Sequence, residues 1–256
     1  MDANEFPLLR ITILGSEGCG KTSIADAFVN NVIARSNPPE PTTLPRLLYR
    51  VMALPIDEGD EQTQKVICEV EDTFSPSKQN EKKSIRSLVD MKRRKLLNLP
   101  RGVKDFTPFS LWRPPIIPHH EGDQYRSIAH GRMGFLIVFD VTDPASFNTA
   151  TELLTLTREF AEYRNPMISP VIFLVANKTD VDTEGDAASR LLGRAELYAQ
   201  QVFCRLWQGS AFTGKNIKRM FVDMAQLILS NGMLWELDYH EESASEESEE
   251  DRCAVM

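Results

Sequence analysis

The octapeptide at residues 15–22, GSEGCGKT, limits what this chain can fold into more than any other feature. It matches G-x-x-x-x-G-K-T, the signature of a phosphate-binding loop. The apolar run before it, at residues 8–14, predicts a buried strand, and residues 22–33 carry apolar side chains at helical spacing. In a strand–loop–helix unit of this kind, the loop N–H groups and the positive end of the helix surround an anion.

This signature predicts which residues bind the phosphates. Lys21 is expected to reach the β- and γ-phosphates and to stabilise charge there, which makes it a predicted catalytic residue. Thr22 is expected to ligate Mg²⁺. The predicted phosphate-binding residues are Gly15, Ser16, Glu17, Gly18, Cys19, Gly20, Lys21, Thr22 and Ser23.

The rest of the chain alternates predicted strands with predicted helices. Continuous apolar runs at 135–141 and 171–176 are typical of the buried centre of a parallel sheet. The alternation predicts an α/β fold of the P-loop NTPase type, with a three-layer, doubly wound, mostly parallel six-stranded sheet and an insertion after the third strand. Further strands are predicted at 46–54 and 65–70, which form a hairpin, and at 204–207, and helices at 146–163, 189–203 and 216–229.

The charge of the chain is concentrated in two blocks that do not fit this alternation. Residues 76–130 hold twelve basic and five acidic side chains, and residues 241–252 hold seven acidic and one basic. We predict a basic insertion at 75–121 and a disordered acidic tail at 236–256. Within the insertion, 84–99 is a predicted basic amphipathic helix that either binds lipid, the tail or a partner, or packs on the domain; its KRRK run also looks like a nuclear localisation patch.

The composition of the chain indicates the compartment in which the protein is expected. The chain has no apolar run long enough to span a membrane, and its first residues lack the layout of a signal peptide. Its four cysteines show no paired spacing, which suits a reducing compartment. We therefore expect a cytoplasmic protein, with no nucleic-acid partner.

A second motif, NKTD at residues 177–180, predicts which base is bound. It directly follows the apolar run at 171–176. The carboxylate of Asp180 can accept two hydrogen bonds from one edge of guanine, from the ring N–H and the exocyclic amine. Adenine lacks that pair of donors, so a buried mismatch would leave polar groups unpaired. This motif makes a P-loop enzyme that uses ATP the less favoured alternative.

With these motifs the chain resembles the Ras superfamily of small GTPases. The resembling residues are GSEGCGKT (15–22), FDVTDPASF (139–147), NKTD (177–180) and GSA (209–211), and the resemblance covers most of residues 8–230 apart from 75–121. It implies a GTP/GDP switch with Mg²⁺ in a G domain at about 5–235, with effectors, exchange factors and GTPase-activating factors as partners. It also implies that Asn177, Lys178 and Asp180 bind the base, with Ser210 and Ala211 beside it. It further implies a metal-binding switch I threonine, which Thr43 fits best, with Thr42 as the competitor.

The chain departs from this family at switch II. The family has D-x-x-G-Q at the end of the third strand, where this chain has Asp72 and Thr73 and then Ser75 and Pro76 in place of the glycine and glutamine. Asp72 can still hold Mg²⁺ through water. Either the insertion splits the motif, so that Gly122 and a catalytic Gln124 supply the missing parts, or the chain is a scaffold that binds GTP without hydrolysing it.

Two residues of the phosphate-binding loop leave alternatives open. Glu17 stands where many relatives have glycine, and it either repels the γ-phosphate or points into solvent. Cys19 is either a small loop filler or a redox-sensitive thiol whose pKa is lowered by Lys21 and the loop N–H groups.

The chain ends in CAVM, a C-a-a-X box in which Met favours farnesylation of Cys253 by a prenyl transferase. No basic run or nearby cysteine provides a second membrane signal, and the upstream residues are acidic. The prediction is a cytoplasmic protein with weak, lipid-anchored attachment to the cytosolic face of a membrane.

Overall fold

A six-stranded sheet forms the centre of the chain in a computed structural model, which describes residues 6–33, 46–55, 63–73, 132–164, 167–181 and 186–236. The strand order is β2-β3-β1-β4-β5-β6, in which β2 runs antiparallel to β3 and all other neighbours are parallel. This arrangement confirms the predicted α/β fold with a mostly parallel sheet. The strands are β1 (Leu8–Gly15), β2 (Arg46–Pro55), β3 (Thr63–Asp72), β4 (Gly134–Asp140), β5 (Val171–Asn177) and β6 (Arg205–Gln208).

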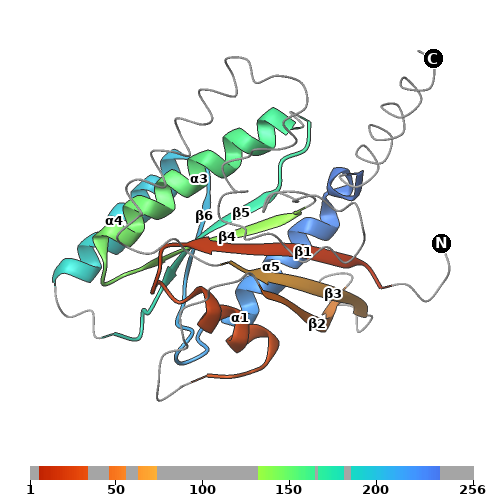
Figure 1. The fold of residues 1–256 in the computed structure, drawn as a ribbon, viewed down its shortest axis with the longest axis horizontal. Helices are drawn as coiled ribbons and strands as arrows, with labels where there is room; N and C mark the ends of the chain where they lie inside the picture. Colours follow the sequence, from red (N-terminus) through yellow and green to blue (C-terminus); the bar gives the residue numbers. More distant parts are fainter. Residues whose placement is uncertain are drawn as a thin grey trace, which may run out of the picture.

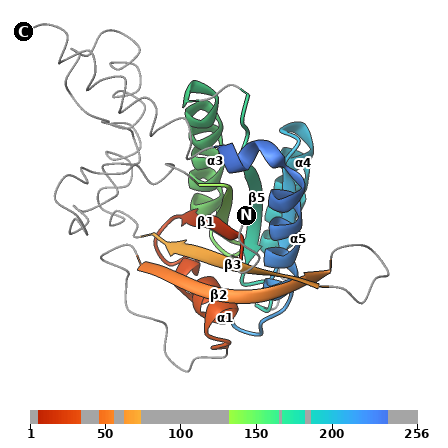
Figure 2. The ribbon, with the colours of Figure 1, turned by 90° about the vertical axis from the view of Figure 1, so that its right-hand side faces the viewer.

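Helices cover both faces of the sheet, as Figure 1 shows. One face packs against α1 and α5 and the other against α3 and α4. The turned view in Figure 2 shows α1 next to β2, β3 and β1. The helices are α1 (Lys21–Val29), α3 (Pro144–Arg164), α4 (Asp186–Gln201) and α5 (Ile217–Ser230), followed by the short 3-10 helix η2 (Gly232–Glu236).

The continuous apolar runs lie where both faces are covered. All seven residues of β4 are buried, as are the last five of β5. On the α1 and α5 side, the rings of Phe28 and Phe221 stack with their centroids 3.7 Å apart. Burial of one phenylalanine side chain stabilises the folded state by about 1.5–3 kcal/mol. The packing of α1 and α5 on the sheet therefore helps to hold the ends of the central strands in fixed positions.

The first helix is shorter than the sequence pattern predicts. It ends at Val29 rather than at residue 33, because Asn30 caps it through its N–H to the Asp26 carbonyl and Asn31 turns left-handed, with φ of 53°. Asparagine is one of the few residues with a side chain that tolerates this conformation. Val32 and Ile33, which continue the apolar pattern, therefore lie outside α1.

Other boundaries shift by a few residues for local reasons. Helix α3 begins at Pro144 because the side chain of Asp143 accepts the N–H of Ala145 at 3.0 Å and caps the first turn. Helix α4 ends at Gln201, two residues before the predicted end, since Phe203 has φ of 50°. The 3-10 helix η2 has no counterpart among the predicted elements, although its Leu234 is fully buried.

Side-chain contacts fix the sheet residues on either side of residues 74–131. Thr73 donates its hydroxyl to the Ile13 carbonyl at 2.6 Å. Arg132, two residues before β4, forms buried ion pairs with Glu69 and Glu71, and the distance from its Nε to Oε2 of Glu71 is 3.3 Å. Each flank of this segment is thus bound to the sheet by contacts of its own.

Candidate functional site

The loop between β1 and α1 has the backbone shape that its glycines suggest. Gly18 and Gly20 adopt left-handed φ angles of 77° and 98°. At Gly20, an added Cβ atom would lie 2.2 Å from Nδ2 of Asn177, so a side chain there would collide with the second motif. Glycine is therefore required at this position by both conformation and space.

Lys21 is buried with its ammonium group held over this loop. Its Nζ donates to the carbonyls of Gly15 and Ser16, both at 3.0 Å, and the residue is only 7% exposed. The Ser16 hydroxyl is buried and has no hydrogen-bond partner within the described part of the chain. A buried cation beside an unpaired hydroxyl, at the N-terminus of α1, fits a phosphate group.

The two predicted metal-binding side chains on described residues lie next to each other. Thr22 Oγ1 donates to Oδ1 of Asp72 at 3.2 Å. Burial raises the pKa of Asp72, although the hydrogen bond from Thr22 and the charge of Lys21 work in the opposite direction. The described residues contain no cluster of three or more His, Cys, Asp or Glu side chains. The neighbouring oxygens of Thr22 and Asp72 fit Mg²⁺, which binds through one or two protein oxygens and takes its other ligands from water and phosphate.

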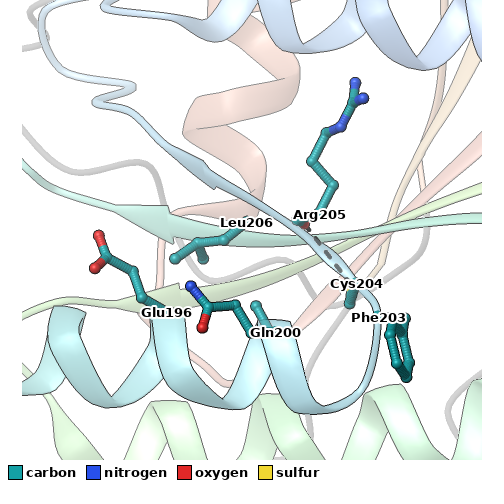
Figure 3. A pocket seen from close by; sticks show the side chains of 7 residues that line it. Glu196, Gln200, Phe203, Cys204, Arg205 and Leu206 are labelled. Atoms are coloured by element: carbon teal, nitrogen blue, oxygen red, sulfur yellow. Dashed lines mark hydrogen bonds between the residues drawn. The ribbon is translucent and has the colours of Figure 1, made fainter.

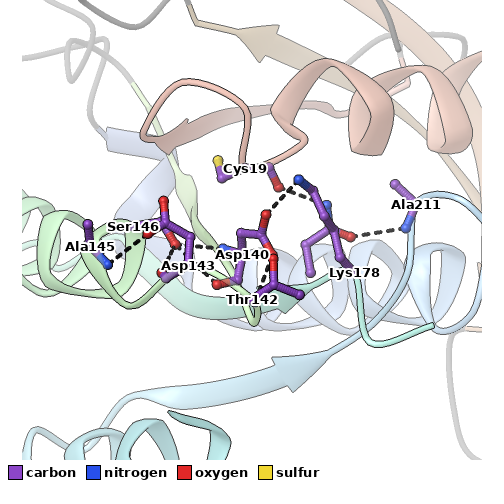
Figure 4. A network of polar contacts seen from close by, with 9 residues as sticks. Cys19, Asp140, Thr142, Asp143, Ala145, Ser146, Lys178 and Ala211 are labelled. Carbon is purple, nitrogen blue, oxygen red and sulfur yellow. Dashed lines mark hydrogen bonds and ion pairs between the residues drawn. The ribbon is translucent and has the colours of Figure 1, made fainter. Parts of the chain in front are cut away.

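Asn177 ties the two sequence motifs together. Its side chain donates from Nδ2 to the Cys19 carbonyl at 2.9 Å and accepts the Ala211 N–H at 3.0 Å (Figure 4). It is 2% exposed. The predicted phosphate loop, the NKTD loop and the GSA loop thus meet at a single buried amide, at the carboxyl ends of β1, β5 and β6, which is where parallel α/β sheets bind ligands.

The remaining residues of the base-recognition motifs lie around this amide. Thr179 is held by two bonds to the Gly209 carbonyl, from its N–H at 3.2 Å and its hydroxyl at 3.0 Å. Asp180 is exposed, and Ser210 is fully buried, with its hydroxyl accepting the N–H of Thr213. The N–H of Ala211, which the resemblance places beside the base, is donated to Asn177 in this structure.

A residue that sequence reasoning did not assign a role contacts this motif. Asp140, the last residue of β4, lies 2.6 Å from Nζ of Lys178 through its Oδ2, and its Oδ1 accepts the N–H and the hydroxyl of Thr142. Burial acts to raise the pKa of Asp140, but the hydrogen bonds from Lys178 and Thr142 outweigh it and hold the pKa below its usual range. The available signal was a carboxylate at the end of a predicted central strand.

Of the two alternatives for Cys19, the redox-sensitive thiol with a lowered pKa does not fit the structure. The thiol is buried, and burial raises its pKa by more than the charge and N–H of Lys21 lower it. Cys19 therefore fits the alternative of a small loop filler. Glu17 is partly exposed, and both of its alternatives stay predictions.

Several predicted site residues lie outside the described residues. These are the switch I candidates Thr42 and Thr43, the split-motif candidates Gly122 and Gln124, and the lipidation candidate Cys253. The insertion with its predicted 84–99 helix, and the tail beyond Glu236, also lie outside them. Their predicted roles stay predictions.

A pocket lies apart from these motifs, between the end of α4 and the start of β6 (Figure 3). Its volume is about 570 Å³, and its lining includes Gln200, Phe203 and Cys204. Arg158 closes the chain turn beside it by donating to the Val202 carbonyl at 2.6 Å. No predicted site residue lines this pocket, so the candidate site is the junction around Asn177.

Comparison with known proteins shows which protein family this chain resembles. The Ras family model matches residues 123–230. The chain is 34% identical to Ras-related protein Rab-4A of Bos taurus over 113 residues, which are 44% of this chain and 48% of the relative. It is 33% identical to Rab-4A of Homo sapiens and to Rab-4B of Rattus norvegicus, covering 48% and 49% of those proteins. Residues 123–230 of this chain are similar to the Ras superfamily of small GTPases.

The matched region covers only part of this chain. It includes the NKTD and GSA motifs but begins well after the loop at 15–22. That loop is joined to the matched region by the bond between Cys19 and Asn177. The chain spans about half the length of the curated relatives it matches. No helix in the described ranges is both long and apolar enough to cross a membrane.

Proposed function

We propose that this chain is a small GTP-binding protein that switches between GTP- and GDP-bound states in signalling or trafficking. One observation carries the proposal: the Asn177 side chain joins the phosphate loop at Cys19 to the GSA loop at Ala211. A guanine nucleotide needs a phosphate site and a base site at a fixed separation. The buried amide supplies that fixed relation between the two sequence motifs.

Each side chain has a proposed task. Lys21 would bind the β- and γ-phosphates, and Thr22, Asp72 and the switch I threonine Thr43 would hold Mg²⁺. Mg²⁺ would neutralise phosphate charge. Asn177, Lys178 and Asp180 would select guanine, with Ser210 and Ala211 beside it. Loss of the γ-phosphate would release the switch segments, which would change the affinity for effectors.

The proposed organisation of the chain follows from its sequence. A G domain at about 5–235 carries a basic insertion at 75–121 in switch II, and an acidic tail at 236–256 carries Cys253 for prenylation. Effectors, exchange factors, GTPase-activating factors and a prenyl transferase are the expected partners. The family match from residue 123 onward supports Gln124 as part of the Ras-like portion of the chain.

The nucleotide that copurifies with the protein tests this function directly. Extraction and chromatography should yield GDP or GTP, in an amount close to one per chain. Competition should then favour GDP over ADP by a large factor, because adenine cannot satisfy Asp180. Copurified ADP or ATP, or equal competition by ADP, would instead point to a P-loop enzyme that uses adenine nucleotides.

Hydrolysis by the purified protein should be slow. Proline at position 76 has no amide to orient water, so we expect a single-turnover rate at or below about 10⁻⁴ s⁻¹, the scale of unassisted small GTPases. Gln124→Leu should lower it further only if Gln124 positions the water. Gln226→Leu on α5 is the matched control, since Gln226 is exposed and belongs to none of the motifs.

The outcome distinguishes a slow switch from a scaffold. No phosphate release over many hours, with tight GTP binding, would favour the non-hydrolysing scaffold. A rate above about 10⁻² s⁻¹, as in proteins that carry their own arginine finger, would contradict the expectation of slow hydrolysis.

Membrane attachment should depend on Cys253 and be weak. One lipid chain gives only marginal anchoring, and an anionic membrane repels the seven acidic residues at 241–251. In cell fractionation we expect a mostly soluble pool whose membrane-bound share disappears in Cys253→Ser. Changing those seven residues to Gln or Asn should raise the bound share several-fold. An unchanged share at low and moderate salt would show that the tail charge does not repel the membrane.

A further inference from the structure

The carboxylate of Asp140 contacts the NKTD loop at Lys178. It accepts three donors: Nζ of Lys178 at 2.6 Å, and the N–H and hydroxyl of Thr142 at 2.8 and 2.7 Å. The two Thr142 bonds fix the orientation of the carboxylate. Figure 4 shows Asp140 lying between Thr142 and Lys178.

The sheet places Asp140 directly beside the start of the NKTD loop. Asp140 ends β4, Asn177 ends β5, and the two residues are paired in the register of these strands. The N–H of Val141 also donates to the Asn177 carbonyl at 3.2 Å. The position of Asp140 is therefore set by the rigid centre of the fold, and not by the loop that it contacts.

The NKTD loop needs this kind of support at Lys178. Lys178 has a φ of 65°, a left-handed conformation that residues with a side chain rarely adopt. Its neighbours are fixed, Asn177 by Cys19 and Ala211 and Thr179 by Gly209. The side chain of Lys178 is fixed by Asp140, whose carboxylate is only 11% exposed. An ion pair with such a partner is screened by water less than a surface pair is.

We infer that Asp140 is a positioning residue for base recognition, because its carboxylate holds Lys178 and so fixes the loop in which Asp180 meets the edge of guanine. This inference rests on the proposed function. Asp140 does not touch the base in this account. Asp140 sets the position of the loop. Its loss should therefore weaken the binding of a nucleotide whose base makes two hydrogen bonds to Asp180 more than the binding of one whose base makes a single bond.

GDP and IDP measure this difference, because inosine keeps the ring N–H of guanine but lacks the exocyclic amine. In Asp140→Asn we expect GDP affinity to fall about tenfold, the scale of one lost charge-assisted hydrogen bond, and the preference for GDP over IDP to fall about threefold or more. Titration with fluorescent GDP, and competition by unlabelled GDP and IDP, give both numbers.

A matched control and a double variant separate positioning from general damage. Asp223→Asn removes a partly exposed carboxylate paired with Arg205, so it should change neither number. If Asp140 acts through Lys178, Asp140→Asn should add less than twofold to the loss in a Lys178→Gln background. If Asp140→Asn does not fold, as judged by circular dichroism, Asp140→Glu keeps the charge but displaces it and should still lower the GDP preference.

Two results would overturn the inference alone. One is an unchanged affinity and an unchanged GDP preference in the folded Asp140 variant. The other is an equal loss of GDP and IDP affinity, which means that Asp140 only stabilises the domain. If the wild-type protein binds neither GDP nor IDP, the proposed function fails and the inference fails with it.

Discussion

Asp180→Asn is expected to change the preferred base from guanine to xanthine, with GDP affinity falling by about 10²–10⁴-fold. The carboxylate would accept two bonds, from the ring N–H and the exocyclic amine of guanine. An asparagine amide in its place points its own N–H₂ donor at one of the two guanine donors, so that hydrogen bond is lost. Xanthine has a carbonyl where guanine has the amine, so it matches the amide again. Asp180 is exposed in the structure, which means that the substitution removes no packing.

Competition binding with GDP and xanthosine diphosphate measures this exchange. Asp180→Ala should lose GDP affinity without gaining xanthosine diphosphate affinity, because alanine restores no bond. Glu196→Gln is the control, an exposed carboxylate on α4 whose partner is Gln208. GDP affinity within threefold of wild type in Asp180→Ala would remove Asp180 from the base site.

Gly20→Ala is expected to reduce nucleotide affinity by about 100-fold or more. The new Cβ would lie 2.2 Å from Nδ2 of Asn177, and the φ of 98° would strain any side chain. Asn177 would have to move, which would weaken its bonds to Cys19 and Ala211 together. Loss of a buried, doubly bonded amide costs more than either bond alone, since its partners are left unpaired.

Gly193→Ala is the matched control for this change. Gly193 lies within α4, with nothing inside 4 Å of an added Cβ and no left-handed φ. It should leave GDP affinity unchanged and stabilise the protein by about 0.5–1 kcal/mol, since alanine favours helix. Isothermal titration and thermal unfolding measure the two effects. Full GDP affinity in Gly20→Ala would mean that the Asn177 junction is not needed for binding.

The parts of the fold that sequence reasoning predicted are those in which local pattern and burial agree. Strands β4 and β5 are apolar throughout because helices cover both sheet faces, so their sequence alone marks them as central. The end of α1 was missed because an asparagine pair, and not the apolar period, stops the helix there. Helix ends depend on a few capping contacts, which an apolar pattern does not encode.

Some residues of the candidate site could likewise be predicted from local sequence, and others could not. The phosphate loop and the NKTD motif are local signals, and the structure brings them together at Asn177. The roles of Cys19 and Asp140 depend on neighbours far away in the sequence. Burial raises the pKa of Cys19, and Asp140 meets Lys178 only because β4 and β5 are adjacent. Neither environment can be derived from the residues on either side.

The contacts of Thr73 and Arg132 have a consequence for how this domain tolerates change. Each flank of residues 74–131 is held by its own bonds to the sheet, through the Ile13 carbonyl and through Glu69 and Glu71. The entropic cost of closing a loop rises by only about 0.6 kcal/mol for each doubling of its length. A change in the length of the sequence between these anchors is therefore expected to cost the domain little stability.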